Sequence, residues 1–111
     1  MKVRATSDSN SFPSLTPGKE YTVVGLDHES FRVLDDEGEP ILFPRSIFAV
    51  IDDAVPKDWI WDRLSDDEFY ADPPELHAPG FYEDLFDGKE NVVRQFECYL
   101  RKAGIASVGV P

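Results

Sequence analysis

Residues 87–105 read DGKENVVRQFECYLRKAGI, and this stretch decides what the rest of the chain has to provide. Its apolar residues recur at spacings of three and four, so they fall on one side of a helix and the charged residues on the other. The apolar stripe consists of Val92, Val93, Phe96, Tyr99, Leu100 and Ala103. The pattern predicts an amphipathic helix over 88–103 that covers an apolar surface elsewhere in the chain.

Both ends of this helix carry sequence signals. Asp87 can accept hydrogen bonds from the first free amide groups, and Glu90 three residues later completes a capping box. Gly104 adopts the left-handed backbone conformation easily, so we expect the helix to stop there. Ile105 should then fold back on Leu100.

The apolar surface is expected in residues 2–51, where β-prone segments alternate with turn formers. Strands are predicted at 2–6, 20–26, 31–34, 40–43 and 49–51, with a single helical turn at 45–48. Short strands with a one-turn element before the last one resemble an SH3-like small barrel, and LTPGKEYTV at 15–23 looks like its opening. The expected fold class is α+β: a small antiparallel SH3-like β-barrel or curved sheet over 2–51, packed by the helix at 88–103.

A single domain is expected from the length of 111 residues. The chain divides into a β-rich part (1–51), an irregular acidic and aromatic part (52–86), the helix (87–105) and a tail with few apolar anchors (106–111). An acidic turn or helix start is expected at 65–68. Three prolines within 69–80 exclude a regular helix there, and a short helix or turn should follow at 81–86.

The charge of the chain is strongly negative and unevenly placed. There are 22 acidic and 11 basic residues, a net charge of -11, and residues 52–90 hold 13 of the acids with 3 of the bases. This charge repels nucleic acid and anionic membranes, so neither is expected as a partner, and it favours a basic protein partner. The alternative is an acidic surface that only keeps the protein soluble.

Cysteine usage and hydropathy indicate a cytoplasmic location. The single cysteine excludes an internal disulfide, and the first thirty residues contain no apolar run of the kind found in signal peptides. No segment approaches membrane-spanning length. The oligomeric state is left open.

No motif for catalysis or for metal binding is found. The two histidines, His28 and His77, lie near no nucleophile motif, so ordinary solvated histidines are expected. Cys98 and two histidines without local spacing do not make a zinc site, and the acidic turns at Gly38 and Gly88 do not fit the register of an EF-hand loop. We therefore expect no catalytic residue, no metal and no cofactor.

The acidic and aromatic middle of the chain remains as the candidate site. Trp59 and Trp61 are separated by one residue, and we expect one of them to be buried and the other to lie at a rim. At least half of the seven rings within 59–86 should be buried, and the others would anchor a basic protein while the acids speed the encounter. The predicted partner-binding residues are Trp61, Asp62, Asp66, Asp67, Glu68, Tyr70, Tyr82, Glu83 and Asp84.

Three segments carry a family resemblance: Trp59, PPEL at 73–76 and GFYEDLFDG at 80–88. The series is similar to small uncharacterised bacterial proteins, some of which lie beside toxin genes as immunity proteins. The resemblance implies a protein that binds and neutralises a cognate toxin, and it assigns no role to a single residue.

Three functions follow as hypotheses. The first is an immunity or inhibitor protein that occludes a basic partner such as a toxin nuclease. The alternative is an SH3-like adaptor or regulatory domain that binds a peptide or a complex subunit. Exposed aromatic residues should lie within 59–86 for the inhibitor and within 21–48 for the adaptor. A carboxylate enzyme, with Glu83 and Asp87 as its acids, would need a cleft with two facing acids of raised pKa.

Overall fold

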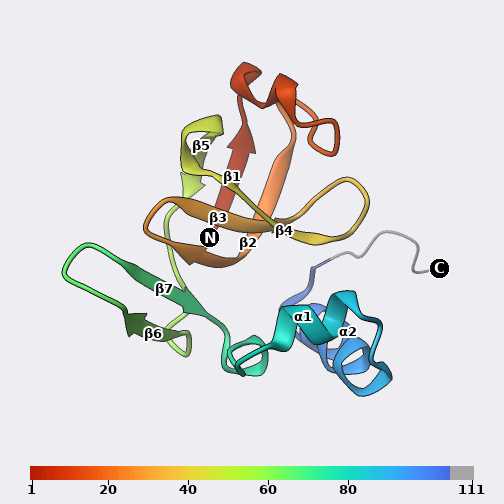
Figure 1. Ribbon diagram of the computed structural model, residues 1–111. Coiled ribbons are helices and arrows are strands. Elements are labelled where there is room, and N and C mark those ends of the chain that lie inside the picture. Colours follow the sequence, from red (N-terminus) through yellow and green to blue (C-terminus); the bar gives the residue numbers. More distant parts are fainter. Residues whose placement is uncertain (106–111) are drawn as a thin grey trace.

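The computed structural model describes residues 1–105, and the predicted tail at 106–111 lies outside the described residues. The strands are β1 (Lys2–Ala5), β2 (Glu20–Asp27), β3 (Ser30–Leu34), β4 (Pro40–Pro44), β5 (Phe48–Asp52), β6 (Ile60–Arg63) and β7 (Phe69–Asp72). The helices are α1 (Phe81–Phe86) and α2 (Glu90–Ala103), and the 3-10 turns are η1 (Ser7–Ser11), η2 (Arg45–Ile47) and η3 (Pro74–Leu76). The predicted α+β class, an antiparallel sheet with a C-terminal helix, is confirmed (Figure 1).

Strand β2 is the element on which the sheet is built. The strand order is β4-β3-β2-β1-β5, every pairing is antiparallel, and β7 joins the C-terminal end of β2 and carries β6 on its other side. Because the order runs from β4 to β5 without a pairing between them, the sheet is open within the described residues. Of the two predicted forms, the closed barrel is not formed.

The first half of the chain follows the predicted pattern closely. All five predicted strands of 2–51 are present, and η2 is the predicted single turn before the last of them. Four elements were not predicted: the turns η1 and η3, and the two strands of the β6–β7 hairpin inside the part expected to be irregular. Figure 1 shows this hairpin and the two helices together on one side of β1 to β5.

The apolar side chains form two clusters. The first draws on strands β1 to β5 and contains Val3, Ala5, Leu15, Tyr21, Val23, Leu26, Phe31, Val33, Phe43, Ile47, Phe48, Trp59 and Ala71. The second lies between the sheet and the helices and contains Val24, Leu34, Leu76, Phe81, Val92, Phe96, Tyr99 and Leu100. Two buried residues of the sheet, Val24 and Leu34, thus provide part of the apolar surface that the helix needed.

A β-bulge lets one strand serve both clusters. The register between β2 and β3 shifts between Val23 and Gly25, which leaves Val24 as the extra residue. Val23 and Leu26 face the first cluster, whereas Val24 is fully buried in the second. The bulge therefore re-aims the strand at the place where the helices dock.

Helix α2 is confirmed, but its predicted start is wrong. It begins at Glu90 after Lys89, and no side chain caps it. Asp87 instead ends α1, where its amide donates to the carbonyl of Glu83, and Gly88 at φ 76° turns the chain between the two helices. The predicted capping box is therefore not formed.

The predicted end of α2 is confirmed. Gly104 has φ 71°, and the amide of Ile105 donates to the carbonyl of Leu100 at 2.9 Å. Ile105 packs against the second cluster, as expected. None of the helices formed by residues 1–105 combines the length and the apolar character needed to cross a membrane.

Candidate functional site

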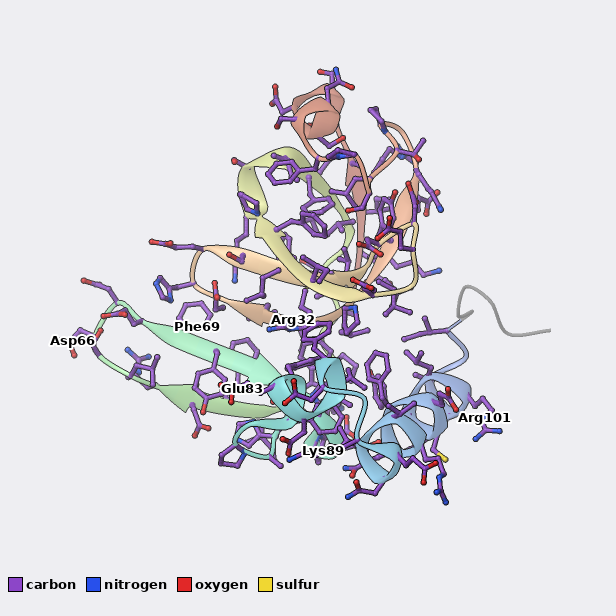
Figure 2. All side chains as sticks on the ribbon, turned by 45° about the vertical axis from the view of Figure 1, so that its right-hand side comes forward. Arg32, Asp66, Phe69, Glu83, Lys89 and Arg101 are labelled. Carbon is purple, nitrogen blue, oxygen red and sulfur yellow. The ribbon has the colours of Figure 1, made fainter. Side chains whose placement is uncertain are left out.

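The β6–β7 hairpin presents the densest group of exposed acids and apolar side chains in the middle of the chain. Its turn is closed by the amide of Leu64, which donates to the carbonyl of Glu68 at 2.8 Å. The acids of the turn, Asp66, Asp67 and Glu68, are exposed, and Figure 2 shows Asp66 at the far tip of the hairpin. The predicted acidic turn at 65–68 is thus present, as the tip of a hairpin.

The two tryptophans of this region behave as predicted. Trp59 is 6% exposed in the first apolar cluster, whereas Trp61 is 54% exposed on β6. The Trp61 ring leans on Phe69 of the neighbouring strand, with 5.9 Å between ring centroids. Leu64 at the turn is 66% exposed. An exposed aromatic side chain and an exposed aliphatic one therefore lie on the same hairpin as the acids of the tip.

The seven rings of 59–86 are less buried than expected. Trp59 and Phe81 are buried, three rings are half-buried, and Trp61 and Phe86 are exposed, so fewer than half are fully covered. Three of these rings lie on the hairpin strands, from which only Ala71 and the half-buried Phe69 take part in the apolar clusters. By contrast, the four aromatic residues of 21–48 are all buried: Tyr21, Phe31, Phe43 and Phe48.

His77 ties the hairpin to the loop that follows it. Its Nδ1 lies 2.5 Å from Oδ1 of Asp72 on β7, and its Nε2 lies 2.7 Å from Oδ2 of Asp62 on β6. Its ring stacks on Tyr70, with 5.6 Å between centroids. The His77 side chain is 19% exposed, so the prediction of a solvated histidine is wrong. Turn η3 brings it back beneath the hairpin.

The two carboxylates set the protonation of this histidine. The pKa of His77 lies above its usual value, chiefly because of its hydrogen bond to Asp72 and further because of the charge of Asp62. Burial raises the pKa of Asp72, and the hydrogen bond from His77 opposes that shift. Each ring nitrogen of His77 thus lies within hydrogen-bond distance of a carboxylate, and the protonated imidazole would donate to both.

A cavity of about 430 Å³ opens beside this histidine. Arg32 on β3 is half-buried in its wall, where its guanidinium lies 3.7 Å from the centroid of the Tyr82 ring and donates to the carbonyl of Pro40 at 2.7 Å. Figure 2 shows Arg32 between the strands and the helices. The polar lining residues are Asp27, His28, Arg32, Tyr70, Asp72, His77, Tyr82 and Glu83.

Burial shifts the pKa values of Arg32 and Tyr82, which contact each other in the wall of this cavity. It lowers the pKa of the Arg32 guanidinium and raises the pKa of the Tyr82 hydroxyl. The Tyr82 hydroxyl is buried and has no hydrogen-bond partner among the described residues. Tyr82 therefore packs beneath Arg32 and is not presented to a partner.

The predicted partner-binding residues fall into two groups. Trp61, Asp62, Asp66, Asp67, Glu68 and Tyr70 lie together on the hairpin, whereas Tyr82, Glu83 and Asp84 lie on α1. Within the second group, Asp84 accepts a hydrogen bond from Lys89 at 2.8 Å, and Glu83 is the exposed residue. The hairpin therefore holds six of the nine predicted residues, with Trp61 on one of its faces and Asp62 and Tyr70 on the other.

A second acidic cluster has a structural explanation. Carboxylate oxygens of Asp35, Glu37 and Glu39 come within 4.8 Å of one another in the turn between β3 and β4. The buried Asp35 accepts hydrogen bonds from the amides of Glu37 and Glu39, at 2.9 and 3.0 Å. This geometry shapes a turn.

Comparison of the chain with protein-family models, with curated protein sequences and with solved structures gave no match. The resemblance to immunity proteins therefore stays a prediction, and the candidate site is interpreted from its own residues.

Proposed function

We propose that this chain is an acidic protein-binding protein of the immunity or inhibitor kind, which occludes a basic surface of its partner, such as the cleft of a toxin nuclease, with the β6–β7 hairpin. One observation carries the proposal: Trp61 is 54% exposed on a hairpin whose turn holds the three exposed acids Asp66, Asp67 and Glu68. An exposed tryptophan is the side chain that most often dominates a protein interface. Acids around it accelerate the encounter with a cationic surface and select for it.

Exposure of rings also separates the inhibitor from the adaptor. The aromatic residues of 21–48 are buried, and the exposed ones, Trp61 and Phe86, lie within 59–86. This distribution is the one expected of the inhibitor.

The contacts of His77 with Asp62 and Asp72 support the same proposal because they fix the position of the hairpin before a partner binds. Asp62 and Asp72 come from the two strands of the hairpin, and His77 joins both to η3. A surface held in place loses less conformational entropy on binding. The tie thus has a role in binding, and the proposed function includes no catalysis and no cofactor.

The proposal also includes the cellular location of the protein. We place it in the bacterial cytoplasm, and the single cysteine, which allows no internal disulfide, supports this location. Nucleic acid is disfavoured as a partner by the net charge of -11.

Charge reversal at the tip tests the proposal. The variant carries Asp66→Lys, Asp67→Lys and Glu68→Lys, and its control carries Asp87→Lys, Glu90→Lys and Glu97→Lys, three exposed acids outside the hairpin. Both have the same net charge, so only the place of the change differs. Proteins captured from a host lysate at low salt should be lost from the tip variant and kept by the control.

The same capture experiment tests the two exposed rings. Trp61→Ala should weaken capture at least about tenfold, whereas Phe86→Ala, which removes the other exposed ring, should not. The captured protein should be a nuclease or another toxin whose activity the wild-type chain suppresses. If the tip variant captures the same proteins as the wild type, the hairpin is not the docking surface.

An SH3-like adaptor is the second candidate, and the strand arrangement favours it. β2 pairs with β1 through its first half and with β3 through its second half, and η2 precedes β5, as in the barrel that the sequence resembles. Leu42 on β4 and Val50 and Ile51 on β5 are exposed. An adaptor would lose binding in the double variant Val50→Ser, Ile51→Ser and keep it in the tip variant.

A further inference from the structure

The free edge of β6 has unpaired backbone groups beside the exposed tryptophan. β6 pairs with β7 alone in the described residues, and β7 has β2 on its other side. Every strand at the end of a sheet offers amides and carbonyls to an additional strand unless something prevents it.

The registers identify the groups that face outward. The amide of His28 donates to the carbonyl of Phe69 at 3.1 Å, so Phe69 and Ala71 of β7 face β2. Because the backbone groups of successive residues point to opposite edges, Tyr70 and Asp72 face β6. Their partners Asp62 and Ile60 face back toward β7.

It follows that Trp61 and Arg63 direct their amides and carbonyls away from the sheet. The amide of Leu64 donates to Glu68 across the hairpin at 2.8 Å, which fits the same alternation. The two outward residues thus offer up to four backbone groups along the free edge.

The other two edges of the sheet are protected against an added strand. β4 begins with Pro40 and ends with Pro44, and proline has no amide to donate. β5 pairs with β1 through a register shift between Lys2 and Val3, an irregularity of the kind that disfavours edge pairing. β6 contains no proline, and its pairing with β7 has no register shift.

Charge decides what kind of strand fits this edge. Residues 58–68 hold five acids and one base. A second copy of the chain would bring two acidic turns together, which is repulsive, whereas a basic segment would be attracted. The occupant that matches the edge is therefore an extended segment rich in lysine or arginine.

The side chains of β6 add a pattern to this charge. Trp61 lies on the face of Phe69, and Asp62 lies on the opposite face, toward His77. Neighbouring residues of an added strand likewise alternate between faces, and directly opposed side chains interact. An apolar residue would lie against Trp61, and a lysine or arginine next to it would lie against Asp62.

We infer that β6 is an acceptor edge, to which the basic partner adds an extended segment of alternating apolar and basic residues as the next strand. This inference rests on the proposed function and names its mode of binding. Backbone hydrogen bonds from Trp61 and Arg63 would give affinity, and the side chains of Trp61 and Asp62 would give selectivity.

One substitution removes an outward amide and leaves the hairpin bonds in place. Arg63→Pro deletes the outward N–H of residue 63, and Arg63→Ala is the matched control, because it removes the same side chain and keeps that N–H. Proline also favours an extended conformation for Asp62 before it, as β6 requires. The probe is a capped octapeptide of alternating lysine and valine.

Two measurements test the inference. Hydrogen exchange of the wild-type chain should show the amides of Trp61 and Arg63 protected at least about tenfold more with the probe than without it. Titration calorimetry should give an affinity at least about tenfold lower for Arg63→Pro than for Arg63→Ala. If Arg63→Pro does not fold, as judged by circular dichroism, the exchange measurement on the wild type decides alone.

Three results would overturn the inference. The first is no binding of the probe at millimolar concentration. The second is equal affinity of the two variants with unchanged exchange at Trp61 and Arg63, in which case a contact through the charges alone remains and the proposed function stands. The third is a dimer, seen by sedimentation, that Arg63→Pro abolishes and Arg63→Ala keeps, because then a second copy covers the edge. Failure of the proposed function itself would appear separately, as unchanged capture by the tip variant.

Discussion

Two polar clusters, one centred on Asp36 and one on His77, hold different halves of this protein together. Asp36 accepts hydrogen bonds from Thr16 at 2.7 Å, Lys19 at 2.7 Å and Tyr21 at 2.8 Å. His77 is the reverse arrangement, one cationic group between the carboxylates of Asp62 and Asp72. The Asp36 cluster joins a loop to a turn inside the β-rich part, and the His77 cluster joins the hairpin to η3.

The Asp36 cluster and the His77 cluster differ in their net charge and in their surroundings. One acid with one lysine and two hydroxyl groups is balanced, so the Asp36 cluster has no charge left for a partner. Two acids around one histidine leave an excess of negative charge, and Asp72 and His77 of this cluster line the cavity of about 430 Å³. Satisfied polar groups in the β-rich part thus serve the fold, and the unbalanced group serves the surface that we propose for docking.

The largest effect on stability is expected at the balanced cluster. Asp36→Ala leaves the buried Tyr21 hydroxyl without its acceptor and Lys19 without its partner, so the free energy of unfolding should fall by about 2 kcal/mol. Urea unfolding at neutral pH measures this change. Asp66→Ala, an exposed acid of the hairpin tip, is the control and should leave the midpoint unchanged. Equal effects of the two variants would contradict the distinction between the clusters.

A smaller effect is expected at His77. His77→Ala removes both contacts to the hairpin, so the free energy of unfolding should fall by about 1 kcal/mol at pH 6, and the amides of β6 should exchange faster. His28→Ala is the matched control, because the polar contacts of His28 are longer, 3.4 Å to the carbonyl of Phe69 and 3.8 Å to Glu29. If β6 exchanges at the wild-type rate without His77, the hairpin is held by β7 pairing alone.

The smallest effect, and the sharpest contrast, is in pH dependence. The pKa of His77 is raised in the folded protein. The contribution of His77 to the free energy of unfolding is therefore complete below pH 6.5, the ordinary pKa of histidine, and is lost as the pH rises through the folded-state pKa. Although burial acts to raise the pKa of Asp36, hydrogen bonds from Lys19, Thr16 and Tyr21 lower it overall. The contribution of Asp36 to the free energy of unfolding is therefore complete above pH 3.8, the ordinary pKa of aspartate, and is lost as the pH falls through the folded-state pKa.

The two clusters should therefore respond to pH in opposite directions. The difference in unfolding free energy between wild type and His77→Ala should shrink from about pH 6 to about pH 9, and that for Asp36→Ala should shrink only in acid. Urea unfolding of the three proteins at several pH values measures both trends, and proton NMR of the His77 ring gives its pKa. A His77 pKa at or below 6.5 would remove the basis for this contrast.

Much of the fold could be predicted because its signals are local. Alternation in the first half gave the five strands, and the three-and-four spacing gave α2, since both patterns depend on residues near in sequence. The different burial of Trp59 and Trp61 does not follow from alternation, because residues two apart share one face of a strand. Trp59 instead precedes β6, which begins at Ile60. The capping box at Asp87 failed because α1 ends at that residue and Gly88 separates the two helices.

The candidate site was only partly predictable. Trp61 and the acids of the turn are recognisable from composition, but Tyr82 is covered by Arg32, and this depends on a contact across fifty residues of sequence. The role of His77 could not be foreseen, because Asp62 comes near it only after β6 folds back on β7. Proline-rich sequence around 73–79 gave no signal for a strand just before it.

The sequence by itself determined the α+β class, the excess of acids in the middle of the chain and the ends of most elements, because propensity, periodicity and charge are properties of neighbouring residues. Tertiary structure alone decided that the sheet stays open among residues 1–105, that a bulge at Val24 divides the apolar residues into two clusters, and that β6 forms a free edge there beside two acids bound by one histidine. Each of these depends on pairing between residues far apart in the chain, whose free energy no local pattern reports.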